Sequence, residues 1–100
     1  MRSELSRRAR NDLERVSKWW LREVGSPPRE LLEELRSTLR MLERMPEAGV
    51  AYASSHGRTI HRILLRNSQF HVYYRLEPGV VRVVSIWGTH RERGPRFPSG

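Results

Sequence analysis

Residues 70–88, FHVYYRLEPGVVRVVSIWG, form two runs of β-branched and aromatic residues around a Pro-Gly pair, a pattern that predicts a β-hairpin. Pro78 and Gly79 suit the two central positions of a type II turn. The first run alternates, so we expect one packed face and one polar, open face. The packed face would hold Phe70, Val72, Tyr74 and Leu76, and the polar face Gln69, His71, Tyr73 and Arg75. The second run is almost continuously apolar, which is typical of a central strand.

Two helical patterns precede this hairpin. Apolar residues recur every three or four positions over 5–24, and Ser6 is a suitable N-cap. Residues 31–45 repeat the spacing, with glutamates early and arginines late, as the helix dipole favours. In the GSPP connection we expect Gly25 to close the first helix, Ser26 to cap the second and Pro27 to begin it. So short a connection predicts an antiparallel helical hairpin.

Beyond the second helix the pattern changes from helical to alternating. The elements expected there are an edge strand at 50–54, a turn at 56–57, a strand at 58–66 and a two-residue hairpin turn at Asn67 and Ser68. The order predicts an α+β fold in which an N-terminal helical hairpin packs on one face of a small, mainly antiparallel sheet. We expect residues 1–95 to form a single domain and residues 96–100 a flexible C-terminal tail.

Composition narrows the classes of function. The 100 residues contain no cysteine, which excludes disulfides and thiolate metal sites. The sequence has no apolar run of about 18 residues and no signal-peptide pattern, so we expect a cytoplasmic protein without a membrane partner. The four histidines lack metal-ligand spacing, so neither a metal nor a cofactor is expected.

The net charge is +8, and it is unevenly distributed. Residues 56–100 hold eight arginines and two acids, which makes their contribution +6. Such an excess indicates a polyanionic partner such as nucleic acid, the ribosome or an acidic protein. In the first helix Trp19 and Trp20 are adjacent, so we expect one of them in the core and the other at its boundary.

Three segments, in this order and at this spacing, resemble the RelE/ParE superfamily of bacterial toxins. They are SRRARNDLERVSKWW, LLEELRSTLRMLERMPEAG and FHVYYRLEPGVVRVVSIWGTHRER, and together they cover nearly the whole chain. The resemblance implies a toxin of a type II toxin-antitoxin system that arrests bacterial growth. It also implies a short first strand at residues 2–5, a cognate antitoxin as partner, and higher-order toxin-antitoxin complexes as a further form of assembly.

By position, the resemblance places the functional surface on the open sheet face and at the end of the last strand. Relatives of the RelE type cleave mRNA in the ribosome without a metal, and a nuclease here would use His71, His90 and Arg91 as catalytic groups. Relatives of the ParE type bind and block DNA gyrase. In either case the residues expected to bind the target or its phosphates are Arg62, Arg66, Tyr73, Arg75, Arg91 and Arg93.

Three departures from the nuclease pattern slightly favour the gyrase interpretation. His71 stands where RelE-like nucleases have an arginine, their paired upstream lysines are missing, and Phe97 stands roughly where a tyrosine is expected. A third hypothesis is a nucleic-acid-binding module that uses charge alone, although no recognition-helix or zinc-finger pattern supports it.

Overall fold

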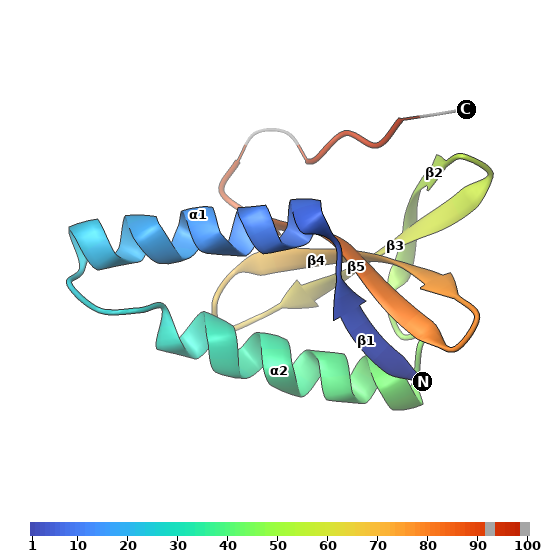
Figure 1. Ribbon diagram of the computed structural model, residues 1–100, viewed down its shortest axis with the longest axis horizontal. Coiled ribbons are helices and arrows are strands. Elements are labelled where there is room, and N and C mark those ends of the chain that lie inside the picture. The colour runs from blue at the N-terminus through green and yellow to red at the C-terminus, as the bar shows by residue number, and fades with distance from the viewer. Residues whose placement is uncertain (92–93, 99–100) are drawn as a thin grey trace.

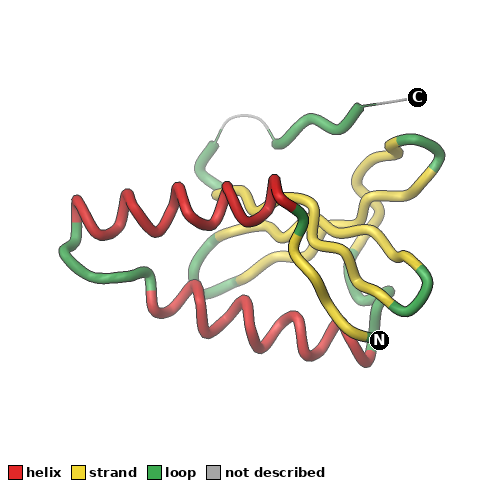
Figure 2. Tube along the Cα trace, in the orientation of Figure 1, coloured by secondary structure: helices red, strands yellow, loops and turns green. Residues whose placement is uncertain are grey.

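The computed structural model describes residues 1–91 and 94–98, and it has two helices and a five-stranded sheet (Figures 1 and 2). The elements are β1 (Arg2–Leu5), α1 (Arg7–Glu23), α2 (Arg29–Arg44), β2 (Val50–Ser55), β3 (Arg58–Leu65), β4 (Phe70–Glu77) and β5 (Val80–Gly88). The expected α+β fold is therefore confirmed, including the first strand that the family resemblance implied.

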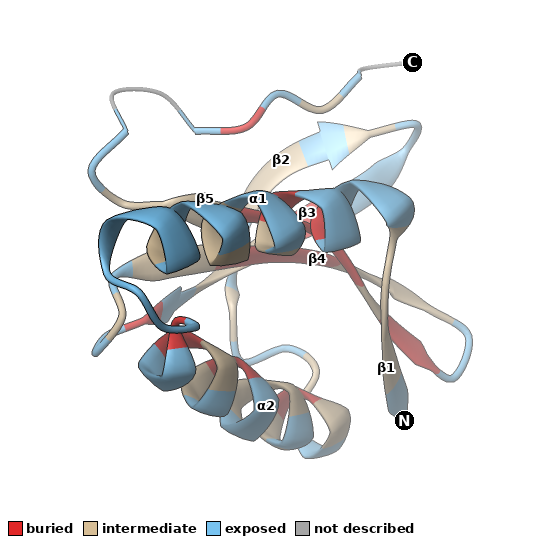
Figure 3. Cartoon of the chain, turned by 60° about the vertical axis from the view of Figure 1, so that its left-hand side comes forward, coloured by how far each residue is buried: buried red, intermediate tan, exposed pale blue. Residues whose placement is uncertain are grey.

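The strands follow the order β1-β5-β4-β3-β2, and only the β1–β5 pair is parallel. The middle strand is β4; the apolar strand β5, expected to be central, lies beside it between β1 and β4. Strand β2 lies at an edge, as predicted. The two helices run in opposite directions beside the sheet (Figure 1). Their outward faces are exposed, whereas their buried residues face the strands (Figure 3).

The helix ends confirm two of the three expected capping roles. Ser6 caps α1, since its hydroxyl accepts a hydrogen bond from the Ala9 amide at 3.1 Å. Gly25 closes α1 with a φ of 87°. The prediction that Ser26 caps α2 is wrong, because α2 begins at Arg29, after Pro28, without a side-chain cap. A residue that precedes a proline is kept out of the helical region, so Pro27 cannot begin the helix.

The connection between β3 and β4 is longer than the predicted two-residue turn. Leu65 pairs with Phe70, so four residues form the loop, and Gln69 takes a φ of 60°. The Glu34 carboxylate on α2 accepts hydrogen bonds from the Ser68 amide at 2.8 Å, from its hydroxyl at 2.7 Å, and from the preceding amide at 2.9 Å. A contact to a distant helix therefore adds to the local hydrogen bond from the Gln69 amide to the Leu65 carbonyl at 2.9 Å.

The main core lies between the helices and the sheet. Its buried members are Ala9, Leu31, Leu35, Leu65, Val72, Val83 and Ile86. A second cluster joins Leu42 of α2 to Tyr74 and Val81. The Tyr74 hydroxyl accepts a hydrogen bond from the Gly49 amide at 2.9 Å and donates one to the Pro46 carbonyl at 2.8 Å. Tyr74 thus ties the segment between α2 and β2 to the sheet.

The opposite sheet face is not open as predicted. Successive strand residues point to opposite faces, so Tyr73 points away from the helices, yet it is only 1% exposed. It packs in a third cluster with Ile60 and Val84, under the rings of Tyr52 and Phe97. The expectation of a polar face is therefore wrong at Tyr73, because aromatic residues from an edge strand and from the C-terminal segment cover it.

The C-terminal segment 94–98 crosses back over this face. Phe97 packs against Tyr52 and Tyr73, and the Arg8 guanidinium lies 4.8 Å from the centre of the Phe97 ring. Arg8 also donates to the Arg96 carbonyl at 2.8 Å. Part of the segment expected to be a flexible tail thus contacts both the sheet and the start of α1.

The Asp12 side chain of α1 accepts hydrogen bonds at the edge of β5 that has no neighbouring strand. The β1 pairing ends at Val83, which leaves the rest of β5 without a neighbouring strand on that side. There the Asp12 carboxylate, 4% exposed, accepts hydrogen bonds from the Ile86 amide at 3.1 Å and the Ser85 hydroxyl at 2.8 Å. It also pairs with Arg15 one turn further along α1. Through this carboxylate, α1 is attached to the edge of the sheet.

Replacement of Asp12 by alanine should lower the free energy of unfolding by about 2 to 3 kcal/mol, because a buried amide and a buried hydroxyl lose their acceptor. Glu14→Ala on the same helix removes only the exposed Lys18 pair and should cost less than about 0.5 kcal/mol. Urea denaturation of both variants measures the difference. Equal losses would contradict the edge role of Asp12.

Tyr74→Phe should lower the free energy of unfolding by about 1 to 2 kcal/mol, since the Gly49 amide and the Pro46 carbonyl would both lose a buried partner. Tyr52→Phe is the matched control, because its hydroxyl lies at the longer distance of 3.4 Å from the Pro95 carbonyl. Thermal or urea unfolding measures both variants. A larger loss for Tyr52→Phe would disprove this ranking.

Candidate functional site

Two neighbouring hollows lie at the C-terminal end of β5, and Trp87, Gly88 and Arg91 line both. The first, which we call the arginine pocket, has a volume of about 250 Å³; its other lining residues include Tyr52, Arg62, His71, Tyr73 and Thr89. The second, which we call the tryptophan groove, has a volume of about 380 Å³; its other lining residues include Asp12, Arg15, Trp19, Trp20, Arg22 and Phe70.

The arginine pocket is built by strand pairing. Arg62 of β3 lies opposite Tyr73 of β4, and His71 is two residues away on the same face. The Arg62 guanidinium lies 5.2 Å from the centre of the Tyr52 ring, within the range of a cation–π contact. No carboxylate is among the described residues that line this pocket. Among these described residues the cations have no acidic neighbour, so the pocket can attract an anion.

Two groups in the arginine pocket, His71 and Tyr73, have shifted pKa values because of burial and the nearby Arg62 charge. Burial, together with the charge of Arg62, lowers the pKa of His71. Burial also raises the pKa of the Tyr73 phenol, and Arg62 only partly offsets this effect. At neutral pH the pocket therefore contains a neutral imidazole and a protonated phenol beside guanidinium groups.

Arg91 lies on the wall between the two hollows. Its guanidinium is 4.2 Å from the centre of the Trp87 ring, a distance typical of a cation–π contact. The contact holds a positive charge just beyond the end of β5 while the Arg91 side chain stays exposed. Arg91 can therefore meet a ligand in either hollow.

The predicted site residues do not all gather in one place. Arg62, His71, Tyr73 and Arg91 line the arginine pocket. Arg75 instead pairs with Glu77 at 2.7 Å, within an ion-pair network that also includes Arg82 and Glu4. Arg66 and His90 are exposed and do not line the pocket, and Arg93 lies outside the described residues.

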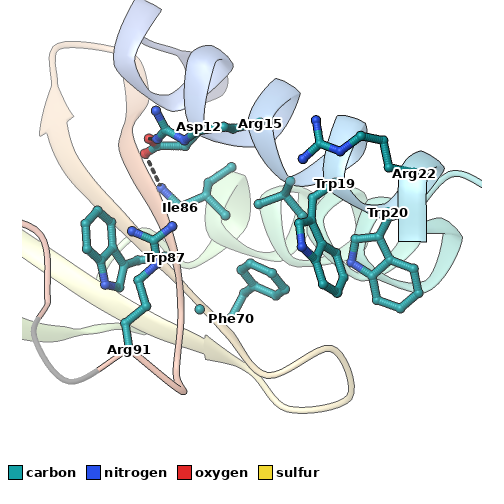
Figure 4. Close-up of a pocket in the computed structure, with 11 residues that line it drawn as sticks. Asp12, Arg15, Trp19, Trp20, Arg22, Phe70, Ile86, Trp87 and Arg91 are labelled. Atoms are coloured by element: carbon teal, nitrogen blue, oxygen red, sulfur yellow. Dashed lines mark hydrogen bonds and ion pairs between the residues drawn. The ribbon is translucent and has the colours of Figure 1, made fainter. Parts of the chain in front are cut away.

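The tryptophan groove is the feature that the sequence analysis missed. All three tryptophans of the protein line it, two from α1 and one from β5 (Figure 4). Trp19 is 49% exposed and packs edge-to-face against the half-buried Trp20, with ring centres 6.0 Å apart. The expectation that one of the two lies in the core is therefore wrong. The adjacent tryptophans were the available signal, but only the tertiary structure brings Trp87 opposite them.

The family described as the ParE toxin of the type II toxin-antitoxin system, parDE, matches residues 4–93. The chain belongs to this family. It is a toxin of a type II toxin-antitoxin system, and an antitoxin is its partner.

A solved structure shares the fold of the toxin. A chain of the chromosomal ParDE toxin-antitoxin system from P. aeruginosa superposes with a TM-score of 0.63 at 14% identity; the match covers 90% of the toxin and 97% of that chain. A search of curated proteins finds no match. The family match and the shared fold confirm that the sequence segments were correctly identified as similar to the RelE/ParE superfamily.

Within residues 1–91 and 94–98 no helix is long and apolar enough to cross a membrane. In the same ranges no three histidine or acidic side chains gather as a metal ion would require.

The His71 imidazole should titrate with a midpoint below the ordinary pKa of 6.5, and Arg62→Ala should raise this midpoint. Because the folded state then binds the proton less tightly than the unfolded state, the contribution of His71 to stability is complete above about pH 6.5 and is lost as the pH falls through the folded-state pKa. NMR titration of the imidazole protons measures the midpoint. Arg66→Ala, outside the pocket, is the control, and a wild-type midpoint at or above 6.5 would refute the assignment.

Proposed function

We propose that the toxin arrests growth in the cytoplasm by binding DNA gyrase and that it does not cleave RNA. The observation that carries this proposal is the packing of Tyr73 beneath Phe97 and Tyr52, which closes part of the sheet face on which a nuclease would place its reacting groups. Membership of the ParE family supports the same interpretation, since the resemblance to ParE-type relatives implies gyrase as the target.

The state of the expected site residues also supports binding over cleavage. The Tyr73 phenol is buried and its pKa is raised, so it is a poor proton donor or acceptor at neutral pH. Arg75 is held by Glu77 and is not available to a phosphate. His90 is exposed and lies outside the arginine pocket, so it is not held beside His71. An enzyme needs such groups fixed together, whereas a binding surface needs only accessible cations.

A second candidate function rests on the arginine pocket itself. Ribosome-dependent cleavage of mRNA requires a base, a phosphate-binding cation and an entry for the message. His71 is neutral at pH 7, as a base must be, and Arg62 and Arg91 line the same hollow. This arrangement favours the mRNA endonuclease as the alternative.

Purified, antitoxin-free toxin should inhibit DNA supercoiling by gyrase and leave mRNA intact in a reconstituted translation reaction. The double variant Arg62→Ala/Arg91→Ala should inhibit gyrase at least tenfold more weakly, because it removes two accessible cations. The matched control, Arg36→Ala/Arg40→Ala, removes two exposed charges from α2 and should stay within twofold of wild type. Primer extension on the message provides the second measurement.

Cleavage of the message would replace gyrase inhibition with ribosome-dependent mRNA cleavage as the function of the toxin. Ribosome-dependent cuts in the message that fall about 100-fold in His71→Ala would establish cleavage with His71 as the base. Gyrase inhibition that is unchanged in the Arg62/Arg91 variant would remove the arginine pocket from the binding surface.

A further inference from the structure

The outward surface of α1, which is exposed along its length, carries a row of cations (Figure 3). Positions 8, 11, 15, 18 and 22 follow one another at alternating intervals of three and four, so their side chains lie along one face of the helix. This row, which we call the cationic stripe, consists of Arg8, Asn11, Arg15, Lys18 and Arg22, all exposed. Its two ends lie about 21 Å apart, because each helical residue rises about 1.5 Å.

The charge of α1 differs from that of α2. Helix α1 holds six cations and three acids, a net charge of +3, whereas α2 holds four arginines and four glutamates and is neutral. The first turn of α1 contains no acid, and Arg7, Arg8 and Arg10 lie there instead, where the helix dipole disfavours positive charge. The excess of cations on α1 therefore does not serve the stability of the helix, which points to a role in binding.

The cations of the stripe remain accessible. Lys18 pairs at 2.8 Å with Glu14, and both side chains are exposed to water. Arg15 reaches the buried Asp12 while 63% of its own side chain stays exposed. Within the described part of the chain, Arg22 forms no ion pair with a carboxylate. Counted together with these two acids, the four cations of the stripe keep a net charge of +2.

Charge and dimensions select among the polyanions that could bind here. A second copy of the toxin is disfavoured, because each chain carries a net charge of +8. An acidic protein segment or a membrane surface needs apolar side chains among the cations, but no member of the stripe is apolar. The major groove of duplex RNA is too deep and narrow for a helix, whereas that of B-DNA is about 12 Å wide and admits one. A row about 21 Å long spans this groove and reaches the phosphates on both sides.

We infer that the cationic stripe binds the sugar-phosphate backbone of duplex DNA. Arg8 and Asn11 contact the backbone on one side of a major groove, and Lys18 and Arg22 contact the backbone on the other side. Because the contacts are made to phosphates, no base sequence is preferred. A toxin that acted on the ribosome would carry the same stripe, so binding of DNA by α1 goes beyond the proposed function.

The test measures binding of a fluorescein-labelled duplex of about 20 base pairs and mixed sequence to antitoxin-free, full-length toxin. Anisotropy is followed from about 50 to about 200 mM salt. We expect saturable binding whose affinity falls steeply with salt, because bound cations release counterions from the DNA. Lys18→Ala/Arg22→Ala should weaken binding about tenfold or more and lower the slope of log K against log salt by about two.

A matched pair of double variants separates position from total charge. Arg36→Ala/Arg40→Ala removes the same number of charges from exposed positions of α2 and should weaken binding less than about threefold. Circular dichroism confirms that each variant is folded.

An added charge tests the same surface without the loss of a contact. Asn11→Lys places a fifth cation within the stripe and should tighten binding about fivefold. Ser37→Lys makes the same charge change at an exposed position of α2 and should stay within about twofold of wild type.

Three results would overturn the inference: no saturable binding at about 50 mM salt, equal weakening by the two double variants, and equal tightening by the two lysine variants. Tighter binding of a single-stranded RNA would also overturn it and would assign the stripe to RNA. Equal binding of polyglutamate would show that the stripe does not select phosphates. The assay contains neither gyrase nor ribosomes, so its failure leaves the proposed function untouched.

Discussion

The Asp12 carboxylate carries a structural role that backbone pairing cannot provide. Strand β1 is too short to cover the whole edge of β5, and an uncovered edge leaves buried amides without acceptors. Asp12 supplies the acceptor from a helix, at 3.1 Å from the Ile86 amide. This contact sets where α1 lies along β5. Because Trp19 and Trp20 lie about two turns further along α1, it also sets their distance from Trp87 and so defines the tryptophan groove.

The two faces of the sheet have different roles. One face packs against the helices and supplies most of the stability through apolar burial. The other face is partly sealed by Phe97 and Tyr52 over Tyr73, and only its end near Arg62, His71 and Arg91 is hollow. Both hollows lie at the C-terminal end of β5, where the arginine pocket and the tryptophan groove share Trp87.

Arginines that look alike in the sequence are not equivalent in the folded protein. Arg75 and Arg82 are neutralised by Glu77 and Glu4, and they hold the far end of the sheet together. Arg62 and Arg91 pack on aromatic rings and keep their charge available. The net charge indicates an anionic partner, but only spatial neighbours show which of the charges such a partner can reach.

Local patterns were sufficient to predict much of this fold. The spacing of apolar residues predicted both helices, Ser6 and Gly25 marked the ends of α1, and the alternation around Pro78 and Gly79 predicted the β4–β5 hairpin. These features depend on residues a few positions apart, so the sequence by itself determined them.

The tertiary structure decided everything that depends on residues distant in sequence. The four-residue loop before β4 follows from Glu34 of α2, and the burial of Tyr73 follows from Phe97, 24 positions later. Asp12 reads as an ordinary polar helix residue, yet it binds an amide 74 positions away. Likewise, the tryptophan groove exists only because α1 and β5 are attached side by side. Periodicity predicts the elements, whereas the site depends on contacts that form only when those elements pack together.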